Sequence, residues 1–120
     1  MEAGFRVVPV PGASSLMTLL SALPQKVDEF FFAGFLPRKE EDRRRKLMEL
    51  RKLHVPIVLM DTPYRLERTL QDIQKTFGKN RILTIGLNLT QPREAIIHDT
   101  VGAILSKVKG QKAEFILIVH

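Results

Sequence analysis

Short apolar runs alternate with longer amphipathic stretches along the chain. The apolar runs have the length of β-strands and cover residues 5–10, 28–35, 57–60, 81–89, 94–97 and 113–119. Strands that alternate with helices are typical of an α/β layer architecture. One of the last three runs, at residues 94–97, is short. We therefore predict a mixed sheet instead of a purely parallel one, with about five strands and helices packed on it.

The amphipathic stretches predict helices with one apolar face. The apolar positions recur every three or four residues: Leu16, Leu19, Leu20 and Leu23; Leu47, Leu50 and Leu53; Leu66, Leu70, Ile73 and Phe77; Val101, Ile104, Leu105 and Val108. Gly78 and Gly110 follow two of these helices, and glycine is a common helix stop. Pro63 suits a first helical position, and we expect Asp99 or Thr100 to cap the last helix.

The composition narrows the class of protein. The chain has 120 residues, 44% of them apolar, which is ordinary for one globular domain. It has no cysteine, and His54, His98 and His120 are isolated from one another, so neither a disulfide scaffold nor a metal site is predicted. No apolar run reaches the length of a membrane span, and the first residues do not resemble a signal peptide. We therefore expect a cytoplasmic protein with no membrane contact.

The net charge favours a polyanionic partner. Lysine and arginine number 19 against 13 acidic residues, which gives a formal charge of +6 and a pI near 10.0. Such an excess of basic residues favours nucleic acid over a membrane surface as the binding partner. The densest basic stretch covers a predicted helix at residues 40–53 and its approach, and includes Arg38, Lys39, Arg43 and Arg44. These residues are candidates for binding phosphate groups of a substrate; a solvated helix face is the alternative.

Aromatic residues do not predict a nucleobase-stacking surface. The basic stretch has no aromatic residue between its charges. Phe30, Phe31 and Phe32 precede it, but consecutive strand residues point to opposite faces of a sheet. We therefore predict that these phenylalanines pack in the core.

Five segments, read in chain order, resemble the tetrapyrrole methylase superfamily. They are residues 3–15 (AGFRVVPVPGASS), 32–39 (FAGFLPRK), 61–66 (DTPYRL), 87–90 (LNLT) and 113–119 (AEFILIV). The run GFLPRK at residues 34–39 is most similar to the branch of this superfamily that methylates ribosomal RNA. The segments extend over nearly the whole chain, so the resemblance concerns the fold as well as single motifs.

The resemblance implies a two-domain, homodimeric methyltransferase that uses S-adenosylmethionine as methyl donor. In this superfamily the donor binds in the cleft between the domains. Residues 1–15 would be the end of the N-terminal domain and the interdomain connection, and residues 16–120 the C-terminal methylase domain. Because this sequence lacks an acidic glycine-rich donor loop, we expect a fragment that needs its own N-terminal domain for activity. The implied reaction is ribose 2′-O-methylation of rRNA in the small ribosomal subunit.

The resemblance also assigns candidate residues. Donor binding is implied for Pro11, Gly12, Ser14, Met60, Leu87, Asn88 and Thr90. Ser14 opens a helix, where free N–H groups attract polar ligand groups, and a helix cap is its alternative role. Met60 ends a predicted strand, where α/β proteins bind ligands, and filling of core space is its alternative. Arg65 matches a family arginine that either binds substrate phosphate or pairs with Asp61 or Glu67.

Some positions depart from the rRNA-methylating branch and leave other functions open. That branch usually has an arginine–glutamate pair and a later lysine where this chain has Leu87, Asn88 and Gln91. These departures concern the substrate more than the fold. Methylation of a corrin, a porphyrin or another small molecule is therefore the second hypothesis, and a non-catalytic nucleic-acid-binding or dimerisation module is the third. No catalytic residue is assigned.

Overall fold

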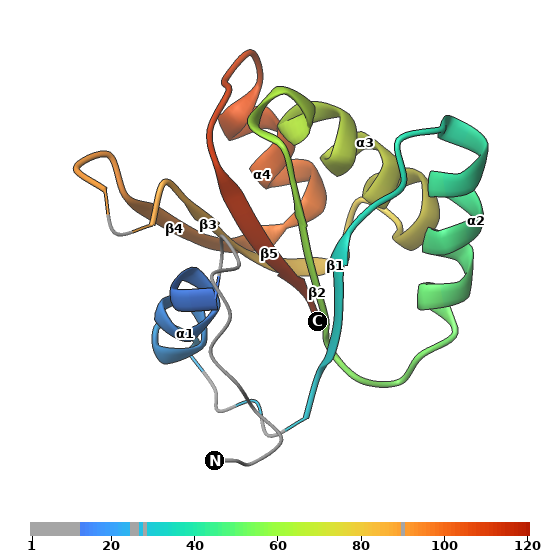
Figure 1. Ribbon diagram of the computed structural model, residues 1–120, viewed down its shortest axis with the longest axis horizontal. Coiled ribbons are helices and arrows are strands. Elements are labelled where there is room, and N and C mark those ends of the chain that lie inside the picture. Colours follow the sequence, from blue (N-terminus) through green and yellow to red (C-terminus); the bar gives the residue numbers. More distant parts are fainter. Residues whose placement is uncertain (1–12, 25–26, 28, 90) are drawn as a thin grey trace.

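The fold is a single mixed sheet with helices on it, as the sequence predicts. The computed structural model describes residues 13–24, 27, 29–89 and 91–120 (Figure 1). The strands are β1 (Phe31–Phe35), β2 (Ile57–Asp61), β3 (Ile82–Leu87), β4 (Ala95–Thr100) and β5 (Phe115–Val119). The helices are α1 (Ala13–Ser21), α2 (Glu40–Arg51), α3 (Leu66–Phe77) and α4 (Val101–Val108), and a 3-10 turn η1 (Pro63–Arg65) leads into α3. The strand predicted at residues 5–10 lies outside the described residues.

The strand directions bring three strand ends to one edge of the sheet. The order is β1-β2-β5-β3-β4, in which β1 and β2 are parallel and β5 runs antiparallel between β2 and β3. β1, β2 and β3 therefore share one direction. Asp61 at the end of β2 and Leu87 at the end of β3 both lie opposite Phe115, the first residue of β5.

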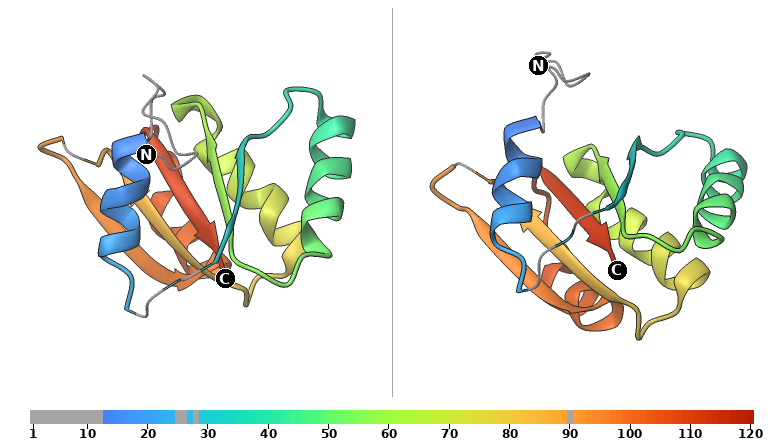
Figure 2. Two further views of the ribbon diagram at one scale, coloured as in Figure 1. Left: turned by 60° about the horizontal axis from the view of Figure 1, so that its bottom comes forward. Right: turned by 90° about the horizontal axis from the view of Figure 1, so that it is seen from below.

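Helices cover both faces of the sheet. α2, α3 and α4 lie on one side and α1 lies on the other (Figure 2). Strand side chains alternate between these sides: Leu59 and Leu117 join the core under α2–α4, whereas Val58 and Ile118 pack with Leu19 of α1. Burial on both sides explains why β5 is an uninterrupted apolar run. Within the described part of the chain, no helix is both long and apolar enough to cross a bilayer.

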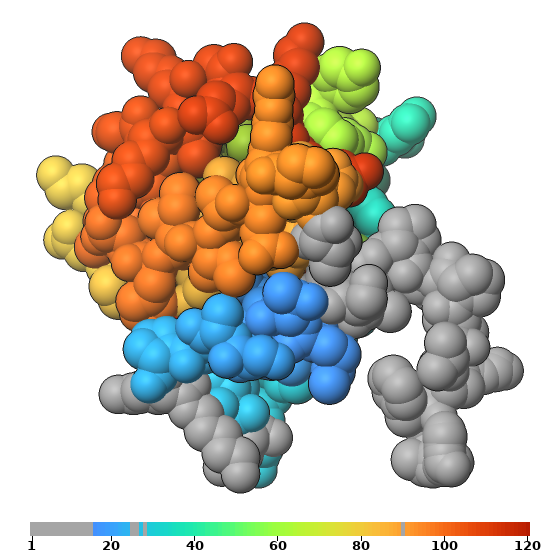
Figure 3. All heavy atoms as spheres, turned by 90° about the vertical axis from the view of Figure 1, so that its left-hand side faces the viewer, coloured from blue at the N-terminus to red at the C-terminus, as the bar shows by residue number. Residues whose placement is uncertain are grey.

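The phenylalanines of β1 correct one prediction. Phe31 and Phe32 are 42% and 47% exposed, so the prediction that they pack in the core is wrong; Phe30 is half-buried and packs on the α1 side. β1 is an edge strand, whereas α1 contacts β3 and β5 and lies against the segment that carries β4 (Figure 3). The alternation of a strand predicts which way a residue points, but not whether a helix covers it.

Asp99 and Thr100 have distinct roles at the start of α4. The Thr100 hydroxyl accepts a hydrogen bond from the N–H of Ala103 at 3.2 Å, so Thr100 is the cap. The Asp99 carboxylate accepts a hydrogen bond from the Thr100 N–H at 2.7 Å and pairs with Lys107. That backbone hydrogen bond is the main cause that holds the pKa of Asp99 below its usual range. Gly110, which follows α4, has a φ of 81°, the conformation that favours glycine.

Two histidines that are distant in sequence meet at one buried hydroxyl. Thr84 Oγ1 lies 2.6 Å from His98 Nδ1 and 2.8 Å from His120 Nε2. Thr84 is fully buried, so these contacts satisfy its hydroxyl group. Burial lowers the pKa of His120, and the neighbouring His98 lowers it further. The folded protein therefore disfavours the protonated form of His120.

We expect mild acid to weaken the fold through His120. In the unfolded chain the histidine pKa is near its ordinary value of 6.5, above that of the folded state. As the pH falls through this range the unfolded chain binds the proton first, so the free energy of unfolding decreases until the pH has passed the folded pKa. Urea unfolding at a series of pH values from about 8 to about 5 measures this decrease.

The variant His120→Gln should lose part of this pH dependence. His54→Gln removes an exposed histidine before β2 and is the matched control for loss of one imidazole. Equal pH dependence in the wild type and in His120→Gln would contradict the prediction.

Candidate functional site

A cavity of about 260 Å³ opens at the edge of the sheet where β1, β2 and β3 end. It is lined by Phe35, Met60, Asp61, Thr62, Pro63, Gly86, Leu89, Glu114, Phe115 and Ile116. Most of this lining is apolar, and Asp61, Thr62 and Glu114 are its polar residues. Ligands of α/β proteins bind outside the carboxyl ends of the strands, so this cavity is the candidate site.

One wall of the cavity depends on a glycine. A Cβ atom on Gly86 would lie 2.6 Å from Cδ1 of Leu89, so only glycine lets the Leu89 side chain fold back over β3. Asn88 has a φ of 50°, a left-handed conformation that asparagine adopts more readily than most residues. Its N–H donates a hydrogen bond to the carbonyl of Glu114 at 2.8 Å, which ties the turn to the start of β5.

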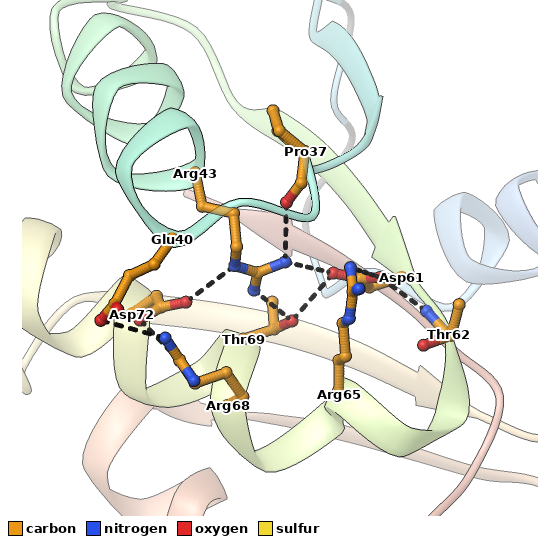
Figure 4. Close-up of polar contacts among 9 residues, drawn as sticks. All are labelled: Pro37, Glu40, Arg43, Asp61, Thr62, Arg65, Arg68, Thr69 and Asp72. Carbon is orange, nitrogen blue, oxygen red and sulfur yellow. Dashed lines mark hydrogen bonds and ion pairs between the residues drawn. The ribbon is translucent and has the colours of Figure 1, made fainter.

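Asp61 lines the cavity, and its carboxylate is almost fully enclosed. Its Oδ2 accepts hydrogen bonds from Arg43 Nη1 at 2.8 Å and from the Thr69 hydroxyl at 3.3 Å (Figure 4). Its Oδ1 accepts the N–H of Thr62 at 2.8 Å, and Arg65 Nη1 lies 3.6 Å away. Because the Asp61 side chain is only 2% exposed and surrounded by donors, it holds the cavity edge in place.

Glu114 is the more accessible of the two acidic residues that line the cavity. It is exposed, and its Oε1 accepts a hydrogen bond from Gln91 Nε2 at 2.8 Å. Gln91 lies in the β3–β4 connection, so this bond joins the two segments that border the cavity on that side. Across the described residues, no group of three or more histidine, cysteine or acidic side chains is arranged to hold a metal ion.

The structure brings only part of the predicted donor site together. Met60 lines the cavity. Leu87 packs in the core under α2–α4, and Asn88 forms the turn beside the cavity with its backbone. Of the other donor candidates, Pro11, Gly12 and Thr90 lie outside the described residues. Ser14 lies in α1, but its side chain is outside the described part of the structure.

Further apolar residues line the cavity without being sequence candidates. They include Phe35, Pro63, Phe115 and Ile116. Each lies within two residues of the cavity end of a strand, and this shared position is the signal that identifies them. Their type does not reveal the site, because apolar residues at strand ends are also common in cores.

Most basic candidates lie on the surface. Arg38 and Lys39 are exposed in the β1–α2 loop, and Arg44 is exposed on α2. Arg65 has a side chain 28% exposed and pairs with Asp61, one of the two partners that the sequence allows. These four residues therefore remain candidates for contacts with substrate phosphate.

Arg43 differs from the other basic candidates because it is buried. It is 2% exposed and pairs with Asp61 and Asp72, so its guanidinium does not belong to the exposed basic surface predicted for it. Arg43 lies four residues before Leu47, on the face of α2 that packs into the core. The run of charges in the sequence does not show that Arg43 is enclosed, because the carboxylates that pair with it lie on other elements.

The chain matches known proteins over most of its length. The model of the family "Tetrapyrrole (Corrin/Porphyrin) Methylases" matches residues 1–105. The chain belongs to this family. Its curated relatives include proteins named ribosomal RNA small subunit methyltransferase I, from Neisseria meningitidis serogroup B (33% identical) and Escherichia coli O157:H7 (36% identical). Both alignments cover 99% of this chain but only 42% and 43% of the relatives, so the chain spans less than half their length.

Solved structures of the family share the fold. The methyltransferase CobJ aligns with a TM-score of 0.62 at 12% identity, over 88% of this chain and 47% of its own. Uroporphyrin-III-C-methyltransferase from Thermus thermophilus aligns with a TM-score of 0.57 at 18% identity, over 96% of this chain and 50% of its own. The predicted α/β fold of the tetrapyrrole methylases is thus confirmed.

We expect Gly86→Ala to displace Leu89 from the cavity wall. The added Cβ would overlap the Leu89 side chain, and overpacking of this kind lowers the free energy of unfolding by about 1–3 kcal/mol. Chemical unfolding of Gly86→Ala, Leu89→Ala and the double variant measures the coupling. The double variant should be more stable than the sum of the single effects predicts, because the overlapping atoms are gone. Strictly additive effects would contradict the proposed close approach.

Proposed function

We propose that this chain is one lobe of an S-adenosylmethionine-dependent methyltransferase, and that the cavity at the ends of β1–β3 is its share of the donor site. The observation that carries the proposal is a largely apolar cavity at this edge in a chain of the tetrapyrrole methylase family. Complete ligand pockets usually enclose about 300–1,000 Å³. The cavity here is smaller, which supports a site completed by a second lobe.

The donor would lie against the apolar wall of the cavity. Met60, Leu89 and Ile116 offer a surface for its adenosine part, and Glu114 offers the accessible carboxylate. The donor carries a methyl group on a sulfonium, which leaves by in-line displacement. The task of this chain is to orient the donor and exclude water from one side, because alignment of the reacting groups lowers the barrier.

We propose ribosomal RNA of the small subunit as the acceptor, methylated on a ribose 2′-hydroxyl. The relatives at 33–36% identity carry rRNA methyltransferase names, whereas the tetrapyrrole enzymes align at 12–18% identity. Arg38 and Lys39 lie in the loop after the cavity end of β1, and Arg44 is a further exposed cation on α2. Such cations hold the phosphates of a nucleic acid beside the site, and the 2′-hydroxyl is the group that distinguishes RNA.

The proposal includes the other partners of the chain. Residues 1–15 are taken as the connection to a preceding N-terminal lobe and residues 16–120 as the C-terminal lobe; α1 already begins at Ala13, inside that connection. Two copies of the complete protein would form a homodimer in the cytoplasm, where ribosomes are available.

Donor binding tests the proposed lobe. The chain joined behind the N-terminal lobe of the N. meningitidis relative should bind S-adenosylmethionine in calorimetric titration about tenfold or more tightly than the chain alone, since half of the contacts are otherwise missing. Met60→Asp should abolish binding in the joined protein, whereas Met48→Asp on the exposed side of α2 should not. Equal affinity of the single chain, or binding that survives Met60→Asp, contradicts the proposal.

RNA binding tests the acceptor. Replacing Arg38 and Lys39 by glutamine should weaken binding of a small-subunit rRNA fragment and lower the slope of log affinity against log salt by about 1.4, or 0.7 for each lost phosphate contact. Replacing Arg51 and Lys52, exposed at the far end of α2, removes the same charge and is the matched control. An equal effect of both pairs would favour non-specific attraction. Methylation of a porphyrin but not of RNA would favour the small-molecule alternative.

A further inference from the structure

One buried guanidinium joins the cavity edge to the exposed basic loop. Arg43 Nη1 donates to the Asp61 carboxylate at 2.8 Å and to the Pro37 carbonyl at 3.3 Å. Its Nη2 donates to the Thr69 hydroxyl at 3.0 Å, and its Nε to the Asp72 carboxylate at 3.1 Å. These partners come from the end of β2, the β1–α2 loop and α3, and all of them surround the guanidinium in Figure 4.

Two of these contacts reach segments with proposed functional roles. Asp61 is itself a cavity residue and accepts the N–H of Thr62, which also lines the cavity. Pro37 directly precedes Arg38 and Lys39, the exposed cations nearest to the end of β1. Because both contacts are made by the same nitrogen of Arg43, the cavity edge and the basic loop cannot move independently without breaking one of them.

We propose that Arg43 is a positioning residue that fixes the separation between the bound methyl donor and the phosphate-binding loop. The inference rests on the proposed function, since it concerns the same site. Arg43 touches neither ligand. It acts through Asp61 on one side and through the Pro37 carbonyl on the other, so that a nucleotide held by its phosphates presents its hydroxyl at a set distance from the methyl group.

The charges around Arg43 support a fixed arrangement. Asp61 also lies near Arg65, and the partly buried Asp72 also pairs with Arg68, so these carboxylates and the arginines compensate one another. A planar guanidinium with five donors can serve several acceptors in fixed directions, whereas the ammonium group of lysine is a single point charge. Arginine is therefore required for the joint contact, although lysine would preserve the charge.

The test compares Arg43→Lys with Asp72→Asn in the two-lobe protein. Asp72→Asn weakens a contact on the α3 side and leaves the contacts to Asp61 and Pro37 in place. A misplacement of about 1 Å costs about 100-fold in rate, so kcat of Arg43→Lys should fall by that order while the affinities for donor and RNA change little. Asp72→Asn should keep kcat close to the wild type.

A purely structural role of Arg43 predicts a different result. Activity would then follow the fraction of folded protein, measured by chemical unfolding at the assay temperature, and Arg43→Lys and Asp72→Asn of equal stability would have equal kcat. That result would overturn the proposal. If Arg43→Lys does not fold, Arg43→Gln replaces it, because this change removes the guanidinium that contacts Asp61 and the Pro37 carbonyl together and leaves no buried positive charge. Its kcat must then fall below that of Asp72→Asn.

Amide exchange separates this inference from the proposed function. In the 120-residue chain without a second lobe, exchange of the Thr62 N–H should be faster in Arg43→Lys than in the wild type and unchanged in Asp72→Asn, because this N–H is bonded to Asp61. If the wild-type two-lobe protein transfers no methyl group, the proposed function fails, and the exchange data still decide whether Arg43 holds the cavity edge. Unchanged Thr62 exchange in Arg43→Lys would overturn the positioning role.

Discussion

The enclosed carboxylate of Asp61 is the constraint on which the site depends. It stands at the end of β2, where an unpaired buried charge would cost about 3–5 kcal/mol. Arg43 of α2, Thr69 of α3 and Arg65 of the η1 turn supply its partners, together with the adjacent Thr62 N–H. Satisfying this one charge therefore fixes three other elements against the end of β2. The shape of the cavity edge follows from that requirement.

The direction of β5 adds a second constraint. Because β5 runs antiparallel between β2 and β3, its first residues lie beside the last residues of its neighbours. The cavity is thus lined by strand ends and a strand start together. Gly86 and Leu89 close it on the side of β3, since only a glycine there leaves room for the leucine to fold back. Apolar packing shapes this side, whereas hydrogen bonds to a charge shape the side of β2.

Within the proposed function, the two sides of the cavity have different roles. The apolar side suits a nucleoside, and the charged side leads into an exposed loop with Arg38 and Lys39. The cavity has a volume of about 260 Å³, and the chain spans less than half the length of its curated relatives. Both facts are consistent with a binding site that a second lobe completes. Rigid support of both sides is useful because alignment of the reacting groups lowers the barrier of methyl transfer.

The sequence by itself determined the mixed α/β fold, the helix faces and the family, because these depend on local periodicity and on motifs in chain order. It also indicated Met60, since ligands of α/β folds bind at strand ends. Only the tertiary structure decided that Phe31 and Phe32 are exposed, that His98 and His120 meet, and that Arg43 is enclosed. Cover by a helix and pairing with a distant carboxylate are contacts between elements far apart in the chain, and no local pattern of residues encodes them.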